Sequence, residues 1–151
     1  EGYMQIAESV LNTTQAIIDG VNKIDGLKVL VQPDMTCLAI GSDHPDIDIL
    51  AVADVMEESG WKMERQQLPN SLHCSIMPHH ARVYPQLLED LAAATQKVRN
   101  NKQLAKEGSA AMYGMVASIP DKTLVEDFTV QFFGEVYRAT GGQPSIAQSY
   151  A

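Results

Sequence analysis

The amino-acid sequence predicts an α+β fold in which a sheet of about four antiparallel or mixed strands carries helices on one face. Three observations indicate this fold. Apolar residues recur at helical spacing in three long segments, and short β-type runs come in pairs between those segments. The order along the chain is therefore helix, strand, strand, helix, strand, strand, helix. With 151 residues, the chain has about the length of one ordinary domain.

The first predicted helix covers residues 3–24 and precedes two short strands. Apolar residues in this segment recur at spacings of three, four and seven, as on one buried helix face, and Gly26 provides a stop. The residues of this face are Ile6, Val10, Ile17, Val21 and Ile24. Two β-type runs, Leu27–Gln32 and Thr36–Gly41, follow, and Pro33-Asp34 between them predicts a turn.

A second helix and a second pair of strands follow in the same order. The helix is predicted over residues 46–59 and ends at Gly60. Its inner face consists of Ile47, Leu50, Val55 and Met56. The runs Trp61–Gln67 and Ser71–Met77 predict the two strands. A third long helix is predicted over about residues 85–106, so residues 1–106 form one small α+β domain.

The remaining residues, 107–151, are predicted to form a loop, a helix and a flexible tail that pack on the same domain. The stretch 108–119 is rich in small residues and predicts the loop. The helix is predicted over about residues 121–139, with Asp121 as its cap. Leu124, Phe128, Phe132 and Val136 recur there at four-residue spacing. Residues 143–151 have few apolar side chains and are expected to fray.

The charge of the chain argues against two classes of partner. Eleven basic residues against 19 acidic ones give a net charge of −8, and nucleic-acid backbones and anionic membranes both attract basic surfaces. No apolar run approaches the roughly 20 residues that span a bilayer. No signal peptide is visible at the start of the sequence. We expect an intracellular protein, since two cysteines without a disulfide framework fit a reducing compartment.

The motifs of common active sites are not found in the sequence. The four histidines, His44, His73, His79 and His80, lack the spacing of metal ligands. No nucleophile elbow and no glycine-rich phosphate loop occurs. Cys37 and Cys74 each lie in an apolar run, which predicts two buried thiols rather than a disulfide. We therefore assign no catalytic residue and no metal site.

Two blocks of sequence carry a family resemblance. The first contains the Gly60-Trp61 pair, then Gln67-Leu68-Pro69, Ser71-Leu72-His73 and His80-Ala81. The second contains Ala111-Met112-Tyr113-Gly114-Met115 and the helix that ends at Tyr137. In this order, the blocks resemble the carboxy-terminal domain of the sphingosine-1-phosphate lyases. The resemblance covers about residues 3–140, and Pro78-His79 departs from it where aliphatic residues are usual.

The resemblance implies the small carboxy-terminal domain of a fold-type I enzyme that uses pyridoxal 5'-phosphate (PLP). Members of this family are homodimers that cleave the C2–C3 bond of phosphorylated sphingoid bases into phosphoethanolamine and a long-chain aldehyde. The family's PLP-binding lysine belongs to a large domain that precedes this segment. The segment is thus expected to shape and close the active site and the dimer, and to be inactive alone. Its location is expected to be cytoplasmic, or cytosol-facing on the endoplasmic reticulum if an upstream anchor exists.

Site residues follow from the same resemblance, by position. The Met-Tyr-Gly block and the last helix approach the substrate channel in this family. The residues assigned to the channel are Met112, Tyr113, Phe132, Val136 and Tyr137. Those assigned a structural role near the site are Gln67, Ser71, His73 and His80. From helical spacing alone, the apolar stripe of the last helix is either ordinary core or a channel wall, and both interpretations stay open.

Two other functions remain open from the sequence. The chain could be the small domain of another fold-type I amino-acid decarboxylase, which an arginine placed to hold a substrate carboxylate would favour. None of Arg65, Arg82, Arg99 and Arg138 lies in a context that marks such an arginine. The chain could also be a freestanding ferredoxin-like module that binds a small ligand.

Overall fold

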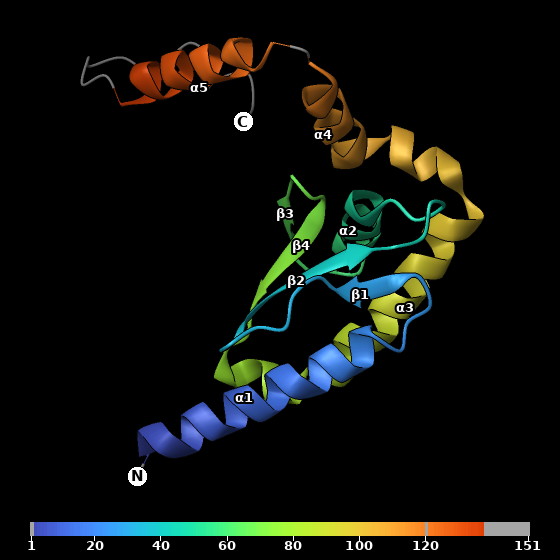
Figure 1. Ribbon diagram of the computed structural model, residues 1–151, viewed down its shortest axis with the longest axis vertical. Helices are drawn as coiled ribbons and strands as arrows, with labels where there is room; N and C mark the ends of the chain where they lie inside the picture. Colours follow the sequence, from blue (N-terminus) through green and yellow to red (C-terminus); the bar gives the residue numbers. More distant parts are fainter. Residues whose placement is uncertain (1, 120, 138–151) are drawn as a thin grey trace. The chain divides into compact units, whose positions relative to one another are not determined.

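The computed structural model describes residues 2–119 and 121–137 of the chain (Figure 1). The chain divides after Tyr113 into two compact units, Glu1–Tyr113 and Gly114–Ala151. The packing of residues 107–151 on the domain formed by residues 1–106 stays a prediction. The predicted frayed tail, residues 143–151, lies outside the described residues.

The first unit contains a four-stranded antiparallel sheet, which confirms the predicted fold class. Its strands are β1 (Leu27–Val29), β2 (Cys37–Ser42), β3 (Glu64–Gln66) and β4 (Ser71–Ser75). They are arranged in the order β1-β2-β4-β3, so β1 pairs with β2 and β3 with β4, while β2 and β4 form the centre. The outer strands β1 and β3 are shorter than the predicted runs, because only three residues of each are paired in the sheet.

The alternation of side chains gives this sheet one apolar face and one open face. On the apolar face, Ile40 of β2 lies opposite Leu72 of β4, and both side chains are fully buried. One position along, Ala39 lies opposite His73 on the other face, where the side chains are only partly buried. The helices pack on the face that carries Ile40 and Leu72, as predicted.

Three α-helices and two short 3₁₀-helices accompany the sheet in the first unit. These are α1 (Gly2–Val21), α2 (Ile49–Glu58), η1 (Pro78–Arg82), α3 (Tyr84–Asn100) and η2 (Lys102–Lys106). Helix α2 is the most deeply buried, since it packs against both α3 and the strands β3 and β4. Asp48 caps it, because its Oδ1 accepts a hydrogen bond from the Leu50 backbone N–H at 2.8 Å.

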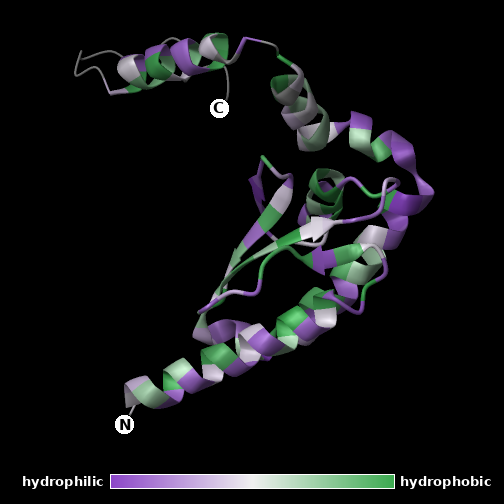
Figure 2. Ribbon diagram, viewed as in Figure 1, coloured by the Kyte–Doolittle hydropathy of each residue, from purple (hydrophilic) through white to green (hydrophobic). Residues whose placement is uncertain are grey.

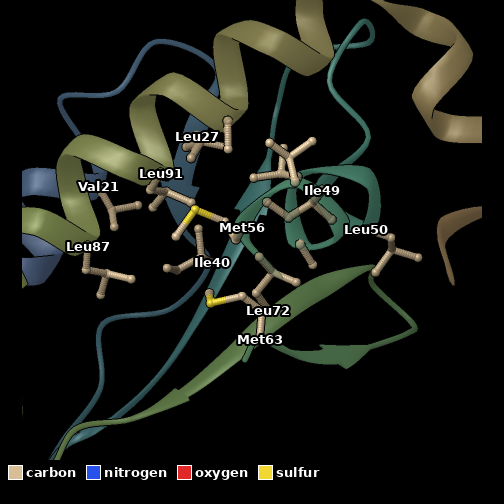
Figure 3. Close-up of a cluster of buried hydrophobic side chains, with 14 of the residues drawn as sticks. Val21, Leu27, Ile40, Ile49, Leu50, Met56, Met63, Leu72, Leu87 and Leu91 are labelled. Carbon is tan, nitrogen blue, oxygen red and sulfur yellow. The ribbon is translucent and has the colours of Figure 1, made fainter. Parts of the chain in front are cut away.

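The core of the first unit fills the space between the sheet and these helices (Figure 3). Met56 of α2 and Leu91 of α3 have no appreciable exposure, and they gather with Ile40 and Leu72 from the strands (Figure 3). Val21, at the end of α1, lies in the same cluster. The unit therefore has one continuous apolar core, which sets the positions of the loops around it.

Two of the predicted helix features were wrong. The third helix ends at Asn100 rather than near Lys106, because Asn101 leaves the helical conformation and its side chain accepts the N–H of Gln103 to start η2. On α1, Ile6 was predicted to face inward, but it is 49% exposed. Figure 2 shows hydrophobic residues mixed with hydrophilic ones up to the amino-terminal end of α1, where Tyr3 and Met4 are also exposed.

Helices α4 (Gly108–Ser118) and α5 (Lys122–Val136) complete the described part of the chain. A loop was predicted over residues 108–119, and this was wrong, because Ala and Met are strong helix formers and outweigh the single internal glycine, Gly114. Helix α5 forms as predicted, and Asp121 caps it by accepting the N–H of Thr123 at 3.0 Å. No helix in the described ranges is long and apolar enough to cross a bilayer.

Candidate functional site

Two of the predicted site residues meet at α4. The side-chain Nε2 of Gln67, in the loop between β3 and β4, donates a hydrogen bond to the backbone carbonyl of Tyr113 at 3.0 Å. The Tyr113 side chain is partly buried against the core, whereas the neighbouring Met112 is 53% exposed. Gln67, which was assigned a structural role, thus holds the backbone of Tyr113, which was assigned to the substrate channel.

The start of α4 is held by a second, charged contact that sequence reasoning missed. Oδ2 of Asp54 in α2 accepts a hydrogen bond from the backbone N–H of Ala110 at 2.9 Å. The other oxygen of Asp54 pairs with the guanidinium of Arg65 in β3. Arg65 also donates to Glu57 Oε1 at 2.7 Å, and its side chain is only 8% exposed. Burial disfavours the charged guanidinium, but Glu57 and Asp54 outweigh that effect and raise the pKa of Arg65.

No signal in the sequence identifies this contact in advance. Asp54 lies 11 positions before Arg65 and 56 before Ala110. Asp54 belongs to α2, Arg65 to β3 and Ala110 to α4. The sequence predicted a loop where α4 forms. Periodicity describes one element at a time, so it does not reveal which side chains of different elements meet.

The residues Ser71, His73 and His80 make contacts within their own region of the first unit. The buried Ser71 hydroxyl donates to the Pro69 carbonyl at 3.2 Å, which closes the loop before β4. His73 Nδ1 lies 3.0 Å from Oε2 of Glu64, across the strand pair on the open face. His80 Nδ1 accepts the backbone N–H of Met77 at 2.7 Å, at the start of η1. These contacts are compatible with the structural role assigned to the three residues, and that role stays a prediction.

His73 and His80 both line one pocket of about 210 Å³. Its lining includes Trp61, Glu64, His73, Cys74, His80 and Leu87. Burial, and to a smaller degree the charge of Glu64, raises the pKa of Cys74 to about 11. This thiol is therefore protonated at neutral pH and is a poor nucleophile. The prediction of two buried thiols was wrong for Cys37, which is exposed because it lies on the open face of the sheet.

Phe132, Val136 and Tyr137 belong to α5, in the second unit. Phe132 stacks on Phe128 with ring centroids 6.3 Å apart and meets Phe133 edge to face at 5.5 Å. Val136 is 37% exposed and Tyr137 is 79% exposed. Met112 and Tyr113 belong to the first unit, so the five channel residues come from both units. Their assignment to one channel stays a prediction.

The described lysines do not fit the role of a PLP-binding residue. The six whose side chains are described are Lys23, Lys28, Lys62, Lys97, Lys102 and Lys106, and all of them are exposed. Lys97 pairs with Glu58 and Lys102 pairs with Asp46, both at 2.6 Å. A Schiff-base lysine lies in a desolvated pocket, and none of these six exposed side chains lies in such a pocket. Within the described residues there is also no group of three side chains suited to a metal ion.

Comparison with known proteins shows which proteins this chain is similar to in sequence and in structure. No family model matches it. It is 35% identical over 131 residues to a sphingosine-1-phosphate lyase of Oryza sativa subsp. japonica, which covers 87% of this chain. It is 34% identical to the sphingosine-1-phosphate lyase of Arabidopsis thaliana over 137 residues, which are 91% of this chain. The solved structure of the Burkholderia pseudomallei enzyme superposes on 78% of the chain with a TM-score of 0.62 and 28% identity.

The chain is a homologue of the sphingosine-1-phosphate lyases. The predicted resemblance is thus confirmed over most of the chain. The chain spans only about a quarter of the length of these lyases, 24% of the Oryza sativa protein and 25% of the Arabidopsis thaliana protein.

A more distant structure supports the fold class alone. The cystine C–S lyase C-DES, in a complex with its product cysteine persulfide, superposes on 59% of the chain with a TM-score of 0.50 and 15% identity. Another structure of C-DES holds glycine linked to its PLP cofactor. Together with the sphingosine-1-phosphate lyase structure, these neighbours confirm that the chain has a fold found within PLP enzymes of fold-type I.

Proposed function

We propose that this chain is the carboxy-terminal part of a PLP-dependent lyase that cleaves phosphorylated sphingoid bases into phosphoethanolamine and a long-chain aldehyde. The observation that carries the proposal is the 34–35% identity to sphingosine-1-phosphate lyases over about nine tenths of the chain. In this proposal, the rest of the enzyme holds PLP through its own lysine. PLP supplies the electron sink for cleavage of the C–C bond, and protein groups supply binding and orientation.

The role proposed for residues 1–151 is to shape and close the active site. The partner is the large PLP-binding domain of the same enzyme, and the enzyme works as a homodimer. We propose a cytoplasmic location, or a cytosol-facing one at the endoplasmic reticulum if an amino-terminal anchor lies upstream. The exposed lysines of the first unit support this division of labour, since none of them is placed to form the Schiff base.

A second candidate is an amino-acid decarboxylase of the same fold type. One specific observation favours it: the chain is 30% identical over 88 residues to a probable L-tyrosine/L-aspartate decarboxylase of Methanothermobacter thermautotrophicus. That match covers only 58% of the chain. Arg65 and Arg99 are already engaged, with Asp54 and with Asp25, and so are poorly placed to hold a substrate carboxylate. Arg82 is exposed, and Arg138 lies outside the described residues. The lyase is the better supported function, because the lyase matches cover 87–91% of the chain at 34–35% identity.

The test uses the full-length protein that contains this chain. Purified with PLP, it should release a long-chain aldehyde and phosphoethanolamine from sphingosine 1-phosphate. It should release no carbon dioxide from tyrosine, aspartate or glutamate. Carbon dioxide from an amino acid, without any aldehyde from the sphingoid substrate, would favour the decarboxylase instead. Binding of a small ligand with neither reaction would favour the freestanding module.

A further inference from the structure

We propose that Asp54, Arg65 and Gln67 form an anchor that positions the start of α4, and with it Met112 and Tyr113, at the substrate channel. These three residues are named the α4 anchor. The inference rests on the proposed function, because the role of Met112 and Tyr113 in the substrate channel is part of that function. The anchor residues act through α4 rather than on the substrate, so they are positioning residues.

The first contact of the anchor holds the amino-terminal end of the helix. The first backbone N–H groups of a helix have no partner inside it, and a carboxylate there is favoured by both hydrogen bonding and the helix dipole. Asp54 supplies this carboxylate to Ala110, which is only 2% exposed. Gly108 makes the approach possible: its φ is +59°, and a Cβ there would lie 2.8 Å from Oδ2 of Asp54. The chain thus enters α4 directly against this carboxylate.

Arg65 fixes the orientation of that carboxylate. Its guanidinium bonds the oxygen of Asp54 that does not reach Ala110, so both oxygens are engaged and the side chain cannot rotate freely. Arg65 is itself held by Glu57, one helical turn after Asp54, and by the Met63 carbonyl. Arg65 thus bridges the two carboxylates through separate nitrogens, and charge-assisted hydrogen bonds of this kind are stronger than neutral ones. The strand β3 and the helix α2 therefore determine together where α4 begins.

Gln67 supplies a second contact on the next turn of the same helix. It bonds the Tyr113 carbonyl, three residues after Ala110, which is about 4.5 Å farther along the helix axis. Two attachment points on successive turns, from α2 and from the β3–β4 loop, resist both sliding and rotation of this part of α4. The Tyr113 ring lies partly against the core, and Met112 stays exposed. The anchor thus sets which of the two side chains is presented outward.

The consequence concerns substrate binding more than the chemical step. A shift of about 1 Å in a positioning element can reduce the rate by about a hundredfold where it aligns reacting groups. A channel wall away from the reacting atoms acts on the alkyl chain instead. Loss of the anchor should therefore raise KM for a long-chain substrate and leave kcat and PLP content nearly unchanged.

The experiment compares three variants of the full-length enzyme. Asp54→Asn weakens the charged contact with Ala110 and Arg65, and Gln67→Ala removes the contact with Tyr113. Asp25→Asn is the control, because Asp25 also pairs with an arginine, Arg99 at 2.5 Å, and it bonds none of the described side chains or backbone groups of α4. Each is measured for hydrogen exchange over residues 108–113, melting temperature, PLP content, and kcat and KM on long-chain and short-chain sphingoid phosphates.

We expect faster exchange over residues 108–113 in both anchor variants, and a rise in long-chain KM on the order of tenfold. The control should show neither change. Unchanged exchange in Gln67→Ala and in Asp54→Asn would overturn the anchor itself. Faster exchange with unchanged KM for both substrates would overturn its role in positioning. If Asp54→Asn does not fold, Gln67→Ala, at a partly exposed loop residue, decides alone. A wild-type enzyme without lyase activity would instead refute the proposed function, while hydrogen exchange would still decide whether the anchor holds α4.

Discussion

His73 and His80 lie seven residues apart in the sequence and line the same pocket, yet their partners differ. Nδ1 of His73 lies 3.0 Å from Oε2 of Glu64. His80 accepts a backbone N–H at Nδ1, a bond that a proton on this nitrogen would break. Burial, with a smaller contribution from the charge of His79, lowers the pKa of His80. Acid therefore acts against the hydrogen bond that His80 accepts.

The lowered pKa of His80 predicts a specific dependence of stability on pH. The unfolded histidine titrates near pH 6.5, and the folded one at lower pH. The stability that neutral His80 contributes is thus complete above about pH 6.5 and is lost as the pH falls through the folded pKa. Urea unfolding of the enzyme at pH 7.5 and pH 5.5 should show a loss of stability in acid that is smaller in His80→Asn.

The control for this prediction is His79→Asn, which should keep most of the acid loss, because burial of His80 is the larger cause of its pKa shift. Equal acid losses in wild type and His80→Asn would contradict the prediction. If His80 is structural, its replacement should also lower the melting temperature more than it changes kcat in folded molecules. A large fall in kcat at unchanged stability would show a direct role in the reaction.

At the scale of elements, α5 has an apolar stripe rich in aromatic side chains. Its aromatic rings contact one another along the helix, and Phe128 and Phe133 stay 58% and 48% exposed. Phe132 and Val136 are four residues apart, and Tyr137 follows, so the three occupy adjacent positions around the helix. Such a surface can line a channel for an alkyl chain.

Truncation of Phe132 or Tyr137 tests this role. Each methylene removed from water contributes about 0.8 kcal/mol, so a channel wall discriminates strongly between chain lengths. We expect Phe132→Ala and Tyr137→Ala in the intact enzyme to raise KM for a long-chain substrate more than for a short-chain analogue. Val130→Ala, a truncation at a residue that is 73% exposed on the same helix, is the control. Equal losses for both substrates together with a lowered melting temperature would indicate ordinary core.

At the scale of the whole molecule, the chain is homologous to only about a quarter of each lyase, 24–25% of the plant proteins. Several large apolar side chains of the first unit are exposed, among them Tyr3 at 91% and Leu68 at 90%. Such groups mark a surface that binds another protein region where they lie together as a patch. The large domain of the proposed enzyme is the partner we expect for them.

Residues 1–151 produced alone should therefore bind no PLP and cleave no sphingoid phosphate. The physical reason is that none of the six described lysines lies in a desolvated pocket. Absorbance near the PLP–lysine band and release of aldehyde are the measurements, and the full-length protein is the positive control. Light scattering should also show self-association of the isolated segment, since its apolar surface is uncovered. Bound PLP or aldehyde release with this segment alone would overturn the division of roles.

The sequence by itself determined the elements and the family of this protein. Helical spacing identified α1, α2 and α5, and paired β-type runs identified a sheet of about four antiparallel or mixed strands, because periodicity and turn residues act within a few neighbouring positions. The Gly60-Trp61 and Met112-Tyr113-Gly114 blocks identified the relatives that the comparisons confirm. The loop predicted at α4 failed because a small-residue stretch has no amphipathic pattern, although its residues favour a helix.

Only the tertiary structure decided how these elements are held together. Asp54 meets Ala110 across 56 positions, and Gln67 meets Tyr113 across 46. Such contacts depend on how α2, β3 and α4 pack in three dimensions, and local propensities carry no information about this packing. The same applies to the exposed Cys37 and Ile6, whose apolar surroundings in the sequence predicted burial. An apolar pattern shows which side chains can be buried, and burial itself requires a neighbouring element to cover them.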